Sequence, residues 1–89
     1  MRSVVLYSRN GCHLCDQARD VILSVRAREP FAFEEVDIET DDDLLRDYGI
    51  RIPVVTVDGE ERFEIAVDRH EFEGLVRVRS QPMDRQPPR

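Results

Sequence analysis

VVLYSRNGCHLCD, residues 4–16, passes from an apolar run into two cysteines, Cys12 and Cys15, that are separated by two residues. The run Val4–Tyr7 is continuously hydrophobic, as a buried strand is, and a helical pattern begins near Gly11. A thiol at a helix N-terminus lies beside unpaired backbone N–H groups and the positive end of the helix dipole, which favour thiolate over thiol. Positions three residues apart share a helix face, so the two sulfurs can reach bonding distance with little backbone movement. The stretch therefore predicts redox chemistry at a strand–helix junction.

The length and charge of the chain exclude several classes of protein. With 89 residues, the chain has the size of one small domain. A formal net charge of -6 argues against nucleic acid or an anionic membrane as a partner, because both need a basic surface. The run Val4–Tyr7 is far too short for a signal-peptide core or a membrane span, so we expect a cytoplasmic protein. In that compartment a lone cysteine pair is more often catalytic or metal-binding than a structural cross-link.

The segments after the cysteines alternate between helical and strand patterns. Apolar residues recur at helical spacing over residues 12–28, and Pro30 closes this helix. Phe31–Ile38 has the aromatic and branched residues of a second strand. A short helix follows, with Thr40 as its predicted N-cap and Gly49 at its end.

The C-terminal half contains a hairpin signal and a last helix. Val54–Val57 and approximately Arg62–Val67 are strand-like, and they flank Asp58 and Gly59, a pair that favours a tight hairpin turn. Asp68 is the predicted N-cap of the last helix. The apolar face of that helix carries Phe72, Leu75 and Val76.

The predicted order of elements is β-α-β-α-β-β-α, which gives an α/β fold with a four-stranded mixed sheet flanked by helices. The first two strands are parallel through a right-handed crossover, and the hairpin adds antiparallel strands at one edge. This is a thioredoxin-like fold, with the cysteine pair at the carboxyl end of the first strand, where open α/β sheets place their sites. We expect residues 1–79 to form this domain and residues 80–89, which include three prolines, to be a disordered tail.

Two motifs give the chain a resemblance to a known family. Residues 7–16 (YSRNGCHLCD), together with Ile52-Pro53-Val54 about forty residues later, resemble the glutaredoxins, and most of all the small glutaredoxin-like proteins with a G-C-H-L-C-D motif. The similarity runs from about Val4 to Val78. It implies that Pro53 is a cis proline facing the reactive sulfur and that the backbone of Ile52 pairs with the substrate.

The resemblance and the helix-start thiol together imply a dithiol thiol–disulfide oxidoreductase. Cys12, the more exposed thiol, attacks a substrate disulfide as the thiolate, and Cys15 then attacks the mixed disulfide and releases the reduced substrate. Arg9 supplies the basic residue that glutaredoxins carry three positions before the nucleophile. With His13 and Arg51 it is a candidate cation for lowering the pKa of Cys12.

Departures from the relatives narrow this expectation. Thioredoxins carry Trp just before the first cysteine and Asp six residues before it, where this chain has Gly11 and Leu6. Glutaredoxins carry Gly-Gly ahead of the last helix, where this chain has Ala66 and Val67, so we expect side chains to crowd glutathione and weaken its binding. Asp68 matches a position that receives the glutathione amino group, and it is equally well explained as an N-cap.

The expected partners follow from the same resemblance. We expect no tightly bound cofactor and no metal, with glutathione or another low-molecular-weight thiol as co-substrate. The substrates are disulfide-containing proteins or small-thiol disulfides, and a thiol or a reductase reduces the cysteine pair again. We expect the protein to be a monomer.

Two metal-binding alternatives stay open from the residues alone. In the first, Cys12 helps to hold an iron–sulfur cluster at a dimer interface, as some glutaredoxin relatives do with glutathione as a further ligand. His13 replaces the proline that usually follows the first cysteine, so that obstacle is absent. The second is a zinc site of Cys12, Cys15 and a histidine such as His70, which lacks the second cysteine pair that closed zinc sites use.

Acidic residues are dense in the second strand and the helix after it. We interpret them as a solvated edge and as residues favoured at a helix start. They are Glu34, Glu35, Asp37, Glu39, Asp41, Asp42 and Asp43.

Overall fold

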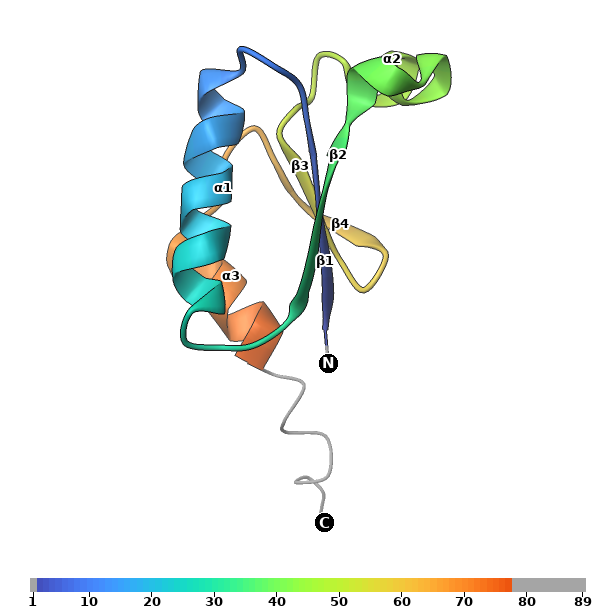
Figure 1. Cartoon of the computed structure of the whole chain (residues 1–89). Coiled ribbons are helices and arrows are strands. Elements are labelled where there is room, and N and C mark those ends of the chain that lie inside the picture. Colours follow the sequence, from blue (N-terminus) through green and yellow to red (C-terminus); the bar gives the residue numbers. More distant parts are fainter. Residues whose placement is uncertain (1, 78–89) are drawn as a thin grey trace.

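The strand β1 (Ser3–Ser8) lies inside a four-stranded mixed sheet in the computed structural model, which describes residues 2–77 (Figure 1). The sheet order is β2-β1-β3-β4, with β2 (Ala32–Asp37) parallel to β1 and β3 (Val54–Val57) antiparallel to it. β4 (Glu60–Glu64) forms the hairpin with β3. The predicted thioredoxin-like fold is confirmed, and the predicted tail lies outside the described residues.

Within residues 2–77, three α-helices accompany the sheet. Figure 1 shows α1 (His13–Arg26) and α3 (Arg69–Arg77) together on one side of the sheet, and α2 (Asp42–Tyr48) at one end on the other side. A 3-10 turn, η1 (Ile38–Thr40), links β2 to α2. No helix within residues 2–77 has the length and the apolar content that crossing a bilayer requires. The core between the sheet and the helices α1 and α3 includes Leu6, Ile22, Val25, Val55, Phe63 and Phe72.

β1 is covered on one face only, which corrects the expectation of a fully buried strand. Val4, Leu6 and Ser8 are buried beneath α1 and α3, whereas Val5 and Tyr7 point to the other face and are half-buried. The rings of Tyr7 and Tyr48 stack with centroids 4.5 Å apart, so α2 shields only part of that face. A continuous apolar run does not distinguish a strand covered on two faces from one covered on a single face.

The start of α2 also differs from the prediction. Asp41, not Thr40, is the N-cap, and its carboxylate accepts hydrogen bonds from the backbone N–H groups of Asp43 and Leu44. The Thr40 hydroxyl instead donates to the carbonyl of Asp37 and closes the 3-10 turn. Because a 3-10 turn precedes α2, the helix begins one residue later than the sequence pattern suggested.

The hairpin turn is tighter than predicted, so β4 begins earlier than Arg62. Asp58 and Gly59 have φ of 53° and 86°, which is the conformation of a two-residue turn that matches strand twist. Val57 therefore pairs directly with Glu60. The strand ends before Ile65, whose φ of 75° breaks the extended conformation.

Asp58 also ties the hairpin to the start of β1. Its carboxylate accepts a hydrogen bond from the Ser3 backbone N–H at 2.9 Å and pairs with the Arg2 guanidinium. Its own backbone N–H donates to the carbonyl of Ser3 at 2.7 Å. The bond from Ser3 and the charge of Arg2 hold the pKa of Asp58 below its usual value, so this carboxylate stays ionised in moderately acidic solution.

Gly74 in the interior of α3 is a site where alanine is expected to stabilise the protein. A Cβ added there meets no atom within 4 Å, so close packing does not require glycine. We expect Gly74→Ala to raise the free energy of unfolding by about 0.5–1 kcal/mol, because alanine favours the helix and restricts the unfolded chain. Urea unfolding measures this change. Gly59→Ala is the matched control. A Cβ at Gly59 also meets no atom within 4 Å, but its φ of 86° strains alanine, so this variant should lower the free energy of unfolding. An unchanged or lower stability of Gly74→Ala would contradict the prediction.

Candidate active site

The two cysteines lie at the first turn of α1, where a loop from β1 enters the helix. Cys12 is the N-cap residue, and the structure contains a disulfide between Cys12 and Cys15 with their Cα atoms 5.2 Å apart. The backbone N–H of Cys15 donates a hydrogen bond to Cys12 Sγ at 3.1 Å. Cys15 is fully buried and Cys12 is partly exposed. The sulfur that a substrate can reach is therefore also the sulfur that the helix N-terminus stabilises.

The segment before β3 has the features expected of a substrate-facing loop. The peptide bond between Ile52 and Pro53 is cis, and Pro53 is buried. The carbonyl of Pro53 accepts a hydrogen bond from the backbone N–H of Ile65 at 2.8 Å, which joins this loop to the end of β4. Among residues 2–77, the backbone N–H and carbonyl of Ile52 have no hydrogen-bond partner. Ile52 thus has a backbone edge free to pair.

Two of the three candidate cations, Arg9 and Arg51, already have carboxylate partners. The Arg9 guanidinium lies 3.0 Å from the Glu39 carboxylate. Arg51 pairs with Glu61 and Glu64, and its guanidinium lies over the ring of a tyrosine in α2. A ligand carboxylate would compete with these partners for either arginine. Their electrostatic effect on the cysteine pair is therefore partly compensated within the protein.

Asp68 and His13 lie at the starts of their helices. The Asp68 carboxylate accepts a hydrogen bond from the backbone N–H of Glu71 at 2.9 Å, which confirms the N-cap interpretation. His13 is the first residue of α1 and is exposed. Within residues 2–77, no group of three or more His, Cys, Asp or Glu side chains is arranged to hold a metal ion.

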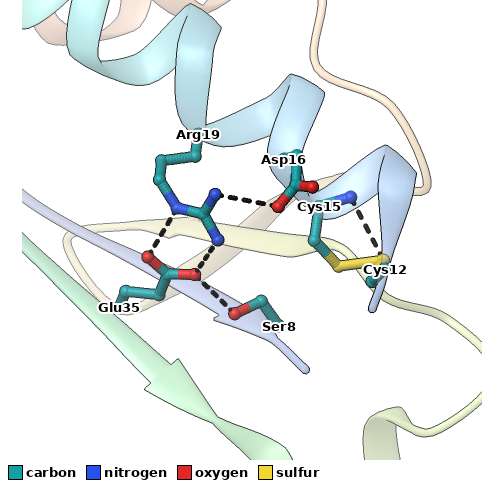
Figure 2. A network of polar contacts seen from close by, with 6 residues as sticks. All are labelled: Ser8, Cys12, Cys15, Asp16, Arg19 and Glu35. Atoms are coloured by element: carbon teal, nitrogen blue, oxygen red, sulfur yellow. Dashed lines mark hydrogen bonds and ion pairs between the residues drawn. A yellow bond between two sulfur atoms is a disulfide. The ribbon is translucent and has the colours of Figure 1, made fainter. Parts of the chain in front are cut away.

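The sequence patterns did not predict a polar network that lies beside the disulfide (Figure 2). The Arg19 guanidinium donates to both oxygens of Glu35, at 2.8 and 2.5 Å, and to Asp16 at 2.9 Å. The hydroxyl of the buried Ser8 donates to Glu35 at 2.7 Å. Hydrogen bonds from Arg19, opposed by burial and reinforced by Ser8, lower the pKa of Glu35. Glu35 is therefore a member of this network and not only part of a solvated acidic edge. Strand alternation in β2 was the available signal, since Glu35 follows Phe33 by two residues and shares its face.

A small hollow of about 120 Å³ lies between α1 and the loop before α3. Leu14 and Val21 of α1 line it together with Ala66 and Val67 of the loop before α3. Ile65 also lines it, at the centre of a tight turn in which the Ala66 N–H donates to the carbonyl of Glu64 at 2.8 Å. The side chains of Ala66 and Val67 therefore line the hollow at the two positions where the resemblance to glutaredoxins implies glycines.

The fold and the bonded cysteines at the start of α1 define a protein of the thioredoxin-like class. Residues 3–77 match the family described as Glutaredoxin-like domain (DUF836). This match covers most of the chain, and the chain belongs to that family. The resemblance seen in the sequence is thereby confirmed.

Several solved structures are similar to this chain. A structural-genomics target protein from X. campestris, XcR50, is 33% identical with a TM-score of 0.68, and the match covers 84% of this chain and 96% of that one. Protein Ne2328 from Nitrosomonas europaea is 26% identical with a TM-score of 0.72, covering 83% and 89% of the two chains. A mutant thioredoxin from Halobacterium salinarum shares the fold at 18% identity, with a TM-score of 0.64 over 98% of this chain and 78% of that one. No curated protein sequence matches the chain.

Proposed function

We propose that this protein is a dithiol thiol–disulfide oxidoreductase that reduces disulfides through Cys12 and Cys15. The observation that carries the proposal is the arrangement of the two sulfurs. Cys12 is partly exposed at the N-cap and its Sγ accepts a hydrogen bond from the backbone N–H of Cys15, while Cys15 is buried and bonded to it. One sulfur is accessible for attack on a substrate, and the other is placed to resolve the product.

The reaction balances as two exchanges of sulfur. The Cys12 thiolate attacks one sulfur of the substrate disulfide, a mixed disulfide forms, and the other substrate sulfur leaves as a thiolate. Cys15 loses its proton and attacks Cys12 Sγ, which releases the second substrate sulfur and closes the Cys12–Cys15 disulfide. The substrate gains two electrons, and its thiolates take up two protons. Two molecules of a low-molecular-weight thiol, or one dithiol reductase, return two electrons to the pair.

The substrate binds along the loop before β3 in this proposal. The unpaired backbone of Ile52 supports it, because an extended peptide can add to such an edge through main-chain hydrogen bonds. Pro53, next along the chain, has no N–H and ends this edge before β3 begins. Arg9, Arg51 and Asp68 are secondary contacts for a substrate that carries charged groups, and each would have to exchange its present partner.

Trapping of substrates tests the proposal. We expect Cys15→Ser to accumulate mixed disulfides with protein substrates, since Cys12 attacks and nothing resolves the product. Mass spectrometry of the trapped proteins identifies the substrates, and a purified protein with one accessible disulfide serves as a defined probe. Cys12→Ser is the matched control, because its remaining cysteine is buried. Equal trapping by the two variants, or trapping by neither, would contradict the assignment of Cys12 as nucleophile.

A further inference from the structure

The network of Ser8, Asp16, Arg19 and Glu35 has no role in the exchange steps described above, yet it lies against the turn that carries the cysteines. Its members come from three elements: β1 supplies Ser8, α1 supplies Asp16 and Arg19, and β2 supplies Glu35. Figure 2 shows the Arg19 guanidinium extending between Asp16 and Glu35, beside the first turn of α1. The network therefore joins the start of α1 to the sheet.

The backbone fixes the position of this network relative to Cys15. Arg19 follows Cys15 by four residues, so the two side chains share a face of α1, and helical side chains lean towards the N-terminus. Glu35 is the register partner of Leu6, which is buried beneath α1. The carboxylate of Glu35 thus approaches α1 from β2, at the level of Leu6 in β1.

The charges near the cysteine pair are distributed unevenly. The network holds two carboxylates and one guanidinium, a net charge of minus one. It borders an open polar hollow of about 230 Å³, to which Arg9 and Asp37 also contribute. Arg9 is paired with Glu39, and Asp37 caps the 3-10 turn. His13, the first residue of α1, is a further titratable side chain in that turn.

The opposite flank of α1 carries no charged group in its lining. The hollow there is bordered by Leu14, Gln17, Ala18, Val21, Ile65, Ala66 and Val67. Uncharged side chains on this flank neither attract nor repel a thiolate through a Coulomb interaction. The charged network on the β2 side of α1 therefore has no counterpart in the lining of this hollow.

We propose that Arg19 and Glu35 act on the Cys12–Cys15 pair with opposite sign and together set its redox equilibrium. Reduction converts an uncharged disulfide into a dithiol that carries thiolate charge. Glu35 disfavours that charge and Arg19 favours it, so each residue shifts the equilibrium in its own direction. Both are positioning residues, since they act on the sulfurs through their field and through the packing of α1. The inference rests on the proposed exchange function.

The contacts of Glu35 keep its carboxylate charged at neutral pH. Arg19 and Ser8 lower the pKa of Glu35, so the carboxylate remains ionised where the cysteines react. The hydroxyl of Ser8 is buried and contributes a hydrogen bond without a charge. Ser8→Ala therefore separates the effect of hydrogen bonding from the effect of charge.

The test compares Glu35→Gln with Arg19→Gln. Both variants break the same ion pair, so a purely structural role would shift the redox equilibrium of both variants in the same direction. We expect Glu35→Gln to shift the equilibrium towards the dithiol by about fivefold to tenfold, and Arg19→Gln to shift it towards the disulfide by a similar factor. A tenfold change corresponds to about 30 mV for this two-electron couple. Ser8→Ala should shift the redox equilibrium less than either glutamine variant does.

The measurement uses the full chain equilibrated in glutathione redox buffers, with the reduced fraction read by alkylation and mass spectrometry. Titration of thiolate absorbance should show the thiol pKa falling in Glu35→Gln and rising in Arg19→Gln. The charge-preserving variants Glu35→Asp and Arg19→Lys should stay near the wild type, and circular dichroism checks that each variant folds.

The outcomes separate this inference from the function on which it rests. Shifts of the same sign, or no shift in either glutamine variant, would overturn the tuning role while exchange by the wild type still stands. A wild-type pair that thiol buffers neither reduce nor reoxidise would contradict the proposed function, and the tuning role with it.

Discussion

Replacing Cys12 with serine is expected to abolish disulfide reduction, with a loss of rate on the order of 10³-fold or more, to the level of the thiol buffer alone. The serine hydroxyl is not ionised at neutral pH and does not form a mixed disulfide, so the first step has no nucleophile. The remaining thiol of Cys15 is fully buried and is not available to replace it. Turnover of a protein disulfide, coupled to a thiol reductant, measures the effect.

The position of Cys12 also predicts the pH dependence of the reaction. Its sulfur accepts the backbone N–H of Cys15 at the start of α1, so its pKa should lie below the roughly 8.5 of a free thiol. Alkylation of the Cys15→Ser protein across pH follows this single thiol. Residual disulfide reduction by Cys12→Ser at the wild-type rate, or an alkylation midpoint at or above that of a free thiol, would contradict the assignment.

Replacing Cys15 with serine is expected to abolish reduction of protein disulfides and to leave only weak turnover of a glutathione mixed disulfide. Reduction of a protein disulfide needs a second thiol to release the substrate from Cys12. Turnover of the glutathione substrate needs only one protein thiol, together with a site that holds the glutathione. We expect the side chains of Ala66 and Val67 to narrow that site, and the ion pairs available to Arg9 and Arg51 contribute only about 0 to 1 kcal/mol each when exposed.

Ala66→Gly in the Cys15→Ser background tests the cause of the weak turnover. Ala66 is exposed and lines the hollow, whereas Val67 packs against the core, so Ala66 is the position that can change without disturbing the fold. We expect this variant to turn over the glutathione mixed disulfide faster than Cys15→Ser alone. If Cys15→Ser already works with the high efficiency of an ordinary glutaredoxin, the side chains at 66 and 67 do not obstruct the site and the inference is wrong.

The features predictable from the sequence are those set by neighbouring residues. The N-cap position of Cys12 and its spacing from Cys15 follow from one turn of helix. The hairpin follows from Asp58 and Gly59, because both residues adopt the positive φ that a two-residue turn needs. Asp68 caps α3 through a bond to a residue only three positions away. Each of these interactions closes within a few residues, so the local sequence is sufficient to specify it.

The features that sequence reasoning missed depend on segments distant in the chain. Glu35 belongs to the network beside the disulfide because the parallel register places it opposite Leu6, and because α1 brings Arg19 over that strand. Strand alternation places Glu35 on the face of Phe33, but nothing near it in the sequence identifies Arg19 as its partner. The half-burial of Tyr7 likewise depends on where α2 lies, through the stacking of its ring on Tyr48.

The sequence by itself determined the class of fold, the reactive pair and the turn that closes the hairpin, since period, spacing and backbone conformation are local properties. Only the tertiary structure decided which face of β1 is covered, that Arg9 and Arg51 are already paired, and that Arg19 pairs with Glu35 beside the first turn of α1. The physical reason is that burial and charge pairing depend on the distance between side chains in space. That distance is fixed only when the sheet register and the packing of α1 bring together residues 16 positions apart, as they do for Arg19 and Glu35.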